Sequence, residues 1–137
     1  MAGAARRAVA SRRSPQYFGL AMKASVRHFI SPDVDIDDFR PDDPENFSFL
    51  LQALVGPADS AGEESLQFLV TTPRSLAEAV QSEGVIFGRS LVIVDAPNMP
   101  RILDSVRRAI ERLEAPSWQL LAQHLTRLGV YEFESEL

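Results

Sequence analysis

The 137-residue chain contains no cysteine, and Lys23 is its only lysine. The lack of cysteine excludes disulfide bonds, thiolate zinc sites, iron–sulfur clusters and a cysteine nucleophile, and it suits a reducing compartment. No apolar stretch approaches the ~20 residues that a membrane-spanning helix requires, so we expect no membrane partner. With 45% hydrophobic and 24% charged residues, the chain has the composition of an ordinary globular domain.

Signatures of catalysis are also missing. The sequence has no G-x-x-x-x-G-K-S/T or G-x-G-x-x-G phosphate loop and no G-x-S-x-G nucleophile elbow. His28 and His124 are the only candidate histidine bases, and neither belongs to a metal-binding spacing such as H-E-x-x-H. We therefore expect no enzymatic activity, no catalytic or metal-binding residues and no cofactor.

Charge divides the chain into two parts. Residues 1–21 hold four arginines and no acidic residue, whereas the other 116 residues carry 10 basic and 19 acidic side chains, a net charge of −9. The first part lacks both apolar periodicity and the apolar region of ~7–15 residues that an export signal needs. We expect residues 1–21 to be a disordered basic leader, from an upstream translation start or added for expression, and residues 22–137 to form one domain.

The first strand is predicted over residues 23–30. Ala24, Val26 and Ile30 fall on one side of it at a period of two. His28 continues the same side, which makes it a packing or surface residue rather than a ligand. A proline- and aspartate-rich connection follows the strand.

Further strands are predicted in the middle of the chain. Residues 47–55 and 66–72 alternate aromatic and branched residues, and the polar turn between them predicts a long-looped hairpin. Residues 91–94 are apolar on both sides, which predicts a strand that is covered on both faces or lies at the centre of the sheet.

Capping residues and apolar periodicity predict three helices. Thr72, Asn98 and Ser117 are each suited to accept a hydrogen bond from the first turn of a helix. The middle helix has an apolar stripe at helical spacing: Ile102, Val106, Ile110 and Leu113. Three arginines of this helix fall among mixed charges and predict a solvated face: Arg107, Arg108 and Arg112.

These elements predict an α+β fold. We expect a mainly antiparallel sheet of about four to five strands with about three helices, in the order β-β-β-α-β-α-α. The alternating residues 130–134 allow a final short strand.

The connection after the first strand is unusually acidic. Its opening, D-x-D-x-D from Asp33, matches the start of a calcium loop, in which carboxylates converge on one hard cation. The sixth position of that loop should be glycine and is Asp38, and the twelfth should be glutamate and is Pro44. A calcium- or small-ligand-binding regulatory module that uses residues 33–45 therefore stays an alternative to a solvated acidic loop.

A protein contact is a third interpretation of this loop. Dense like charges repel one another unless a cationic partner uses them, and they can raise the encounter rate with a basic partner by ~10- to 10³-fold at low salt. Nucleic acid is excluded as a partner, because phosphate binding requires an excess of lysine and arginine. The loop carries seven acidic residues: Asp33, Asp35, Asp37, Asp38, Asp42, Asp43 and Glu45.

Two sequence blocks are specific when they occur together. P-D-D-P-E-N-F-S-F-L-L-Q-A occupies residues 41–53, and G-E-E-S-L-Q-F-L-V-T-T-P occupies residues 62–73. Other landmarks lie at residues 31–35, 56–57, 88–89, 91–94, 117–118 and 131–134. In order and spacing these stretches resemble the immunity protein 8 family of bacterial polymorphic toxin systems, over residues 22–134.

The resemblance implies a small cytoplasmic α+β protein that binds and neutralises a cognate toxin without catalysis. Residues 33–45, together with Glu63 and Glu64 at the hairpin loop, are then candidates for the surface that faces the toxin. An acidic surface of this kind would suit a basic, nuclease-type toxin. The sequence leaves open the toxin's identity and activity, the stoichiometry and any homo-oligomerisation.

Overall fold

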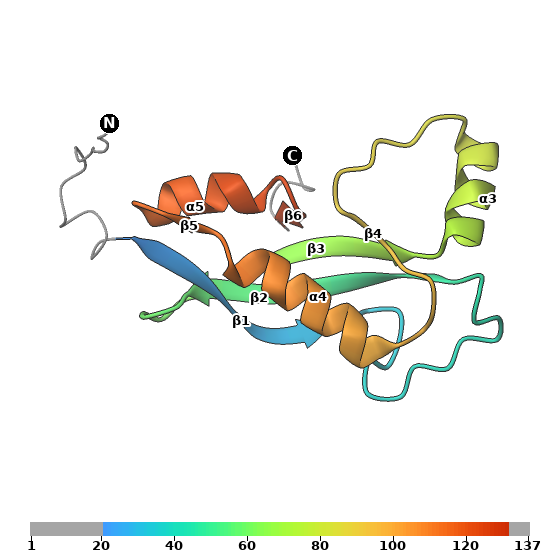
Figure 1. Cartoon of the computed structure of the whole chain (residues 1–137), viewed down its shortest axis with the longest axis horizontal. Helices are drawn as coiled ribbons and strands as arrows, with labels where there is room; N and C mark the ends of the chain where they lie inside the picture. Colours follow the sequence, from blue (N-terminus) through green and yellow to red (C-terminus); the bar gives the residue numbers. More distant parts are fainter. Residues whose placement is uncertain (1–20, 132–137) are drawn as a thin grey trace, which may run out of the picture.

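The computed structural model describes residues 21–131 (Figure 1). Helices and strands follow in the predicted order, with one additional short strand between the last two helices. In chain order the elements are β1 (Met22–Ile30), β2 (Ser48–Pro57), β3 (Glu64–Thr71), α3 (Pro73–Glu83), β4 (Leu91–Ile93), α4 (Met99–Glu111), β5 (Glu114–Ala115), α5 (Trp118–Leu125) and β6 (Val130–Tyr131). The predicted α+β fold is confirmed.

Two predictions concern residues outside this range. The basic leader expected over residues 1–21 lies outside the described residues apart from Ala21, and so does the predicted final strand beyond Tyr131. Within residues 21–131, no helix is long and apolar enough to cross a bilayer.

The strands form one mixed sheet in the order β4-β3-β2-β1-β5, and β6 also pairs with β3. All neighbours are antiparallel except β3 and β4, which run parallel. β4 lies at the edge of the sheet, and its Ile93 is 56% exposed. The prediction of a covered or central strand at residues 91–94 was therefore wrong. Only Val92 and Val94 pack against the core, whereas Ile93 lies on the opposite face.

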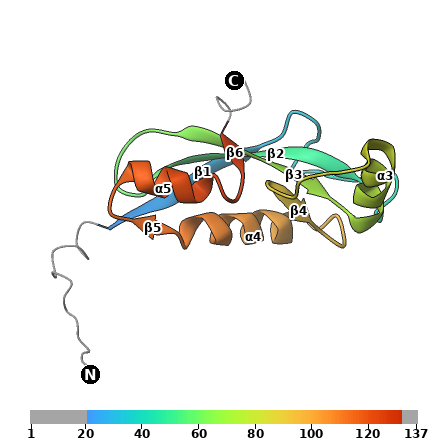
Figure 2. The same ribbon diagram turned by 90° about the horizontal axis from the view of Figure 1, so that it is seen from above.

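Helices α4 and α5 lie on the same side of the sheet (Figure 2). The predicted caps are confirmed, because the side-chain oxygens of Thr72, Asn98 and Ser117 each accept a backbone hydrogen bond in the first turn. α4 buries the predicted apolar stripe from Ile102 to Ile110 in the main core. α3 differs, since it stands at one end of the sheet and buries none of its residues.

A β-bulge at Arg27 interrupts the alternation of β1. Between Val26 and His28 the pairing with β2 shifts by one residue, so two residues of β1 face one of β2. His28 is exposed as a result, and Ile30 is 45% exposed. The prediction that both residues continue the side of Val26 was wrong, because one inserted residue turns every later side chain to the other face.

The bulged Arg27 holds the turn between β2 and β3. Its Nη2 donates to the carbonyl oxygens of Pro57 at 2.7 Å and Ser60 at 2.6 Å. The two arms of this turn approach closely, because a Cβ atom added at Gly56 would overlap the carbonyl oxygen of Gly62. The turn therefore depends on a guanidinium from a neighbouring strand and on a glycine at its base.

Two side chains of α4 form hydrogen bonds with the backbone of β1, on the edge that no strand covers at Val26. The backbone N–H of Val26 donates to Oε2 of Glu111 at 2.9 Å, and Nη1 of Arg107 donates to the Val26 carbonyl at 3.1 Å. The Arg107 guanidinium also lies 5.3 Å from the centre of the Phe29 ring. The prediction that Arg107 belongs to a solvated face was therefore wrong, since no strand pairs with this edge of β1 at Val26 and the helix supplies its hydrogen bonds.

Candidate functional site

The acidic loop, residues 31–46, is fastened to β2 at its start. Asp33 Oδ2 accepts a hydrogen bond from the backbone N–H of Leu50 at 2.7 Å, and Ser31 Oγ donates to the Leu50 carbonyl at 2.6 Å. These two side chains continue the β1–β2 pairing after β1 has ended at Ile30. Asp33 therefore has a structural role, although its carboxylate is exposed at the surface.

The remainder of the loop is oriented by apolar residues that lie between its acidic ones. Val34, Ile36 and Phe39 pack against the core, while all seven acidic residues of the loop are exposed. The Phe39 ring lies 5.1 Å from Phe47 and 4.9 Å from Phe49, measured between ring centres. Apolar residues thus hold the loop over the end of the core, and its carboxylates face solvent.

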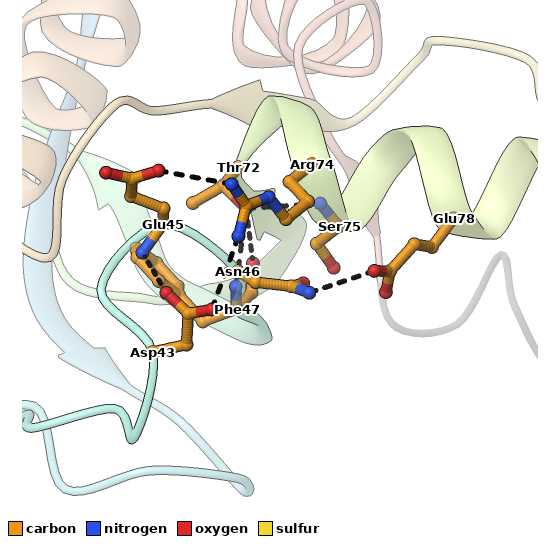
Figure 3. A network of polar contacts seen from close by, with 8 residues as sticks. All are labelled: Asp43, Glu45, Asn46, Phe47, Thr72, Arg74, Ser75 and Glu78. Carbon is orange, nitrogen blue, oxygen red and sulfur yellow. Dashed lines mark hydrogen bonds and ion pairs between the residues drawn. The ribbon is translucent and has the colours of Figure 1, made fainter.

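Ion pairs connect the acidic loop to the first turn of α3 (Figure 3). Arg74 Nη1 lies 3.5 Å from Asp43 Oδ2, and Arg74 Nη2 lies 3.4 Å from Glu45 Oε1. Asn46 Nδ2 donates to Glu78 Oε2 at 3.0 Å. Each contact is exposed and therefore weak by itself, but together they fix the loop and the helix relative to each other.

Thr72 joins the loop and the helix from inside. It is 1% exposed, and its Oγ1 accepts hydrogen bonds from the backbone N–H groups of Phe47 and Ser75, each at 3.3 Å. Its own N–H donates to the Phe47 carbonyl at 3.1 Å. The residue predicted as a helix cap therefore also anchors the start of β2.

The carboxylates of the loop do not converge on a common point. Asp35 Oδ1 accepts the N–H of Asp37 at 2.9 Å, and Asp38 Oδ1 pairs with Arg40 Nε at 2.7 Å. Among residues 21–131 there is no group of three or more histidine, aspartate or glutamate side chains that could hold a metal ion. The geometry thus gives no support to the calcium-binding alternative.

Two carboxylates of the loop remain available. Within residues 21–131 the side chains of Asp37 and Asp42 have no ion pair and no hydrogen-bond partner. Asp37 lies on an open groove of about 650 Å³ between the acidic loop and the start of α4, whose other lining residues include Phe39 and Leu103. Carboxylates beside an apolar floor are complementary to an arginine or lysine side chain, which combines a charged head with an aliphatic stem.

Glu63 and Glu64 do not belong to the same surface. They lie at the turn between β2 and β3, at the end of the sheet opposite to the acidic loop (Figure 1). The ten residues of β2 separate the two ends, which corresponds to ~30 Å of extended strand. The predicted site residues therefore form two separate groups.

Negative charge is concentrated at the end that carries the acidic loop. Residues 31–46 and α3 together hold nine acidic and two basic side chains, a net charge of −7. The rest of residues 21–131 holds seven acidic and eight basic side chains, a net charge of +1. The negative net charge of residues 21–131 therefore comes entirely from this end of the molecule.

A comparison with known protein families agrees with the resemblance seen in the sequence. A family model described as Immunity protein 8 matches residues 24–135. The chain belongs to the immunity protein 8 family. Comparisons with curated proteins and with solved structures find no match. The match confirms the resemblance carried by the blocks at residues 41–53 and 62–73, and it makes the chain an immunity protein of toxin systems.

Sequence patterns did not identify two features of this end. Arg74 follows Pro73 without any periodic signal, and its pairing with Asp43 becomes visible only when α3 is placed beside the loop. Residues 85–87 lie between two glycines and are apolar in a chain segment that has no predicted element. That apolar triplet was the available signal for an exposed hydrophobic tip.

Proposed function

We propose that this chain binds and neutralises a cognate bacterial toxin by non-covalent contact and catalyses no reaction. Membership of the immunity protein 8 family supports the role, and the charge distribution carries the choice of surface. A net charge of −7 at one end, with Asp37 and Asp42 unpaired within the described residues, favours a positively charged partner.

The acidic loop would face a basic surface of the toxin, as a nuclease-type toxin offers at the cleft that binds its substrate. Complementary potentials steer the two proteins together and reject partners of like charge. In this proposal Asp37 and Asp42, which make no described side-chain contact, meet the toxin directly, whereas Asp33, Asp35 and Asp43 mainly hold the loop in shape. Glu63 and Glu64 would reach the same toxin only through a second contact at the far end of the sheet.

The site of action that fits this role is the cytoplasm of the producing cell, where a toxin that acts on nucleic acid has its target. The absence of cysteine suits such a reducing compartment.

The test uses the full chain and the C-terminal domain encoded by the adjacent toxin gene. Asp37→Asn combined with Asp42→Asn removes two charges without removing a described contact. We expect the association rate to fall by about 3- to 10-fold at about 50 mM salt, and by much less at about 300 mM, because salt screens the steering field. Glu63→Gln combined with Glu64→Gln is the matched control.

Two results would contradict the proposal. The first is an association rate and a salt dependence that are the same in the Asp37/Asp42 variant, the control and the unchanged protein. The second is the absence of any binding together with the absence of protection in cells that express the toxin domain.

A further inference from the structure

A long segment of the described chain contains no fully buried residue. From Pro73 to Asn98 no residue is buried, whereas Thr72 before it is 1% exposed and Met99 after it is 5% exposed. The segment contains α3, and Figure 1 shows this helix standing at the end of the sheet. A helix of a globular protein normally buries an apolar stripe, so a helix without any buried residue is unusual.

The segment ends in an exposed apolar tip. Phe87 is 88% exposed and Val85 is 73% exposed, and they are the two most exposed large hydrophobic residues of the described chain. Gly84 stops α3 with a φ of 85°, a conformation that other residues rarely adopt, and its N–H donates to the Val80 carbonyl. The chain therefore leaves the helix at a defined point and presents Val85 and Phe87 to solvent.

The segment that carries the tip starts beside the acidic loop, and Figure 1 shows α3 leading from there to the tip on the side away from the loop. We call residues 73–90 the α3 arm. Arg74 ties the base of the arm to Asp43 and Glu45, and Glu78 ties its middle to Asn46 (Figure 3). A partner that docks on the acidic loop thus meets an apolar tip whose distance from the loop is set by these contacts.

We propose that the tip of the α3 arm inserts Phe87 into an apolar pocket of the toxin, beside the basic surface that the acidic loop contacts. This inference rests on the proposed function and adds a hydrophobic anchor to it. Aromatic side chains that fill a pocket commonly dominate the energy of an interface, while surrounding charges set its encounter rate and specificity.

Charge argues against a second copy of this chain as the occupant. A symmetric dimer through the α3 arm would bring together two ends that each carry a net charge of −7. Like charges face each other across such an interface and oppose association. A partner with a positive surface and an apolar pocket satisfies both features of this end.

The apolar tip and the acidic loop predict effects on different rate constants, so they can be tested separately. Phe87→Ala in the full chain should raise the dissociation rate of the adjacent-gene toxin domain by about 10- to 100-fold. Its association rate and salt dependence should change by less than about 2-fold, because no charge is altered. Phe87→Leu keeps an apolar side chain and should restore part of the affinity.

Leu120→Ala is the matched control. Leu120 lies on α5 at the other end of the sheet and is 43% exposed, so this variant also removes surface apolar area. Thermal unfolding should show that Phe87→Ala folds as the unchanged protein does, since the residue is almost fully exposed.

The outcomes separate this inference from the proposed function. An unchanged dissociation rate in Phe87→Ala, or an increase no larger than in Leu120→Ala, overturns the anchor while the proposed function stands. Sedimentation that shows a dimer of the unchanged chain and a monomer of Phe87→Ala, with equal toxin binding, assigns the tip to self-association and also overturns it. A toxin domain that does not bind the unchanged protein contradicts the proposed function and this inference together.

Discussion

Glu111 of α4 accepts a hydrogen bond from the backbone N–H of Val26, 85 positions earlier in the chain, at 2.9 Å. The bond lies beside the bulge of β1, on the edge of β1 that no strand covers at Val26. A helix side chain thus replaces a strand, and the contact holds α4 against the edge of the sheet.

Replacement of this carboxylate should destabilise the fold. Glu111→Ala leaves the Val26 N–H without its acceptor and removes the partner of Arg107, so we expect the free energy of unfolding to fall by about 1–2 kcal/mol. Urea unfolding measures the change. Asp104→Ala, which removes an exposed ion pair with Arg108, is the control and should stay within about 0.5 kcal/mol. Equal effects of the two variants would show that the Val26 contact contributes nothing.

Carboxylates of the acidic loop should differ sharply in their effect on stability. Asp33→Ala removes the acceptor of the Leu50 N–H and should cost about 1–2 kcal/mol, whereas Asp42→Ala removes no described contact and should cost less than about 0.5 kcal/mol. Both variants lose one negative charge, so a difference in their unfolding midpoints reports the hydrogen bond. Indistinguishable midpoints would contradict the assignment of Asp33 to a structural role.

Alanine should destabilise the protein at one glycine and be neutral at another. Gly56→Ala would place a methyl group on the carbonyl of Gly62 and 2.9 Å from Arg27 Nη2, so the turn between β2 and β3 must open. We expect a loss of about 2 kcal/mol or more, because backbone atoms cannot move aside as a flexible side chain does. Gly88→Ala, with no atom within 4 Å of the added methyl group, should leave the stability unchanged. Thermal unfolding of both variants measures the difference. A stable Gly56→Ala variant would show that this turn is not closely packed.

Local signals in the sequence were enough for the helices and for most of the sheet. Thr72, Asn98 and Ser117 were identifiable as caps because a cap needs only a short polar side chain within one turn of the helix. The bulge at Arg27 and the edge position of β4 were not identifiable, because each depends on the strand that pairs with it. A period-two pattern carries no information about an inserted residue or about the order of strands.

The candidate site shows the same division. The density of acidic residues favoured an exposed loop, and all seven of its acidic residues are exposed. The contacts of individual carboxylates could not be predicted, because they involve residues distant in the sequence, such as Leu50 for Asp33 and Arg74 for Asp43. The separation of Glu63 and Glu64 from the loop likewise follows from the length of β2, which was predicted, and from the direction of the hairpin.

The lack of buried residues between Pro73 and Asn98 has an evolutionary consequence. Surface substitutions usually change folding free energy by no more than about 0.5 kcal/mol. The exposed side chains of the α3 arm that make no described contact can therefore vary while the fold persists. Under the proposed function, residues that face the toxin can therefore change as the toxin changes, at little cost in folding stability.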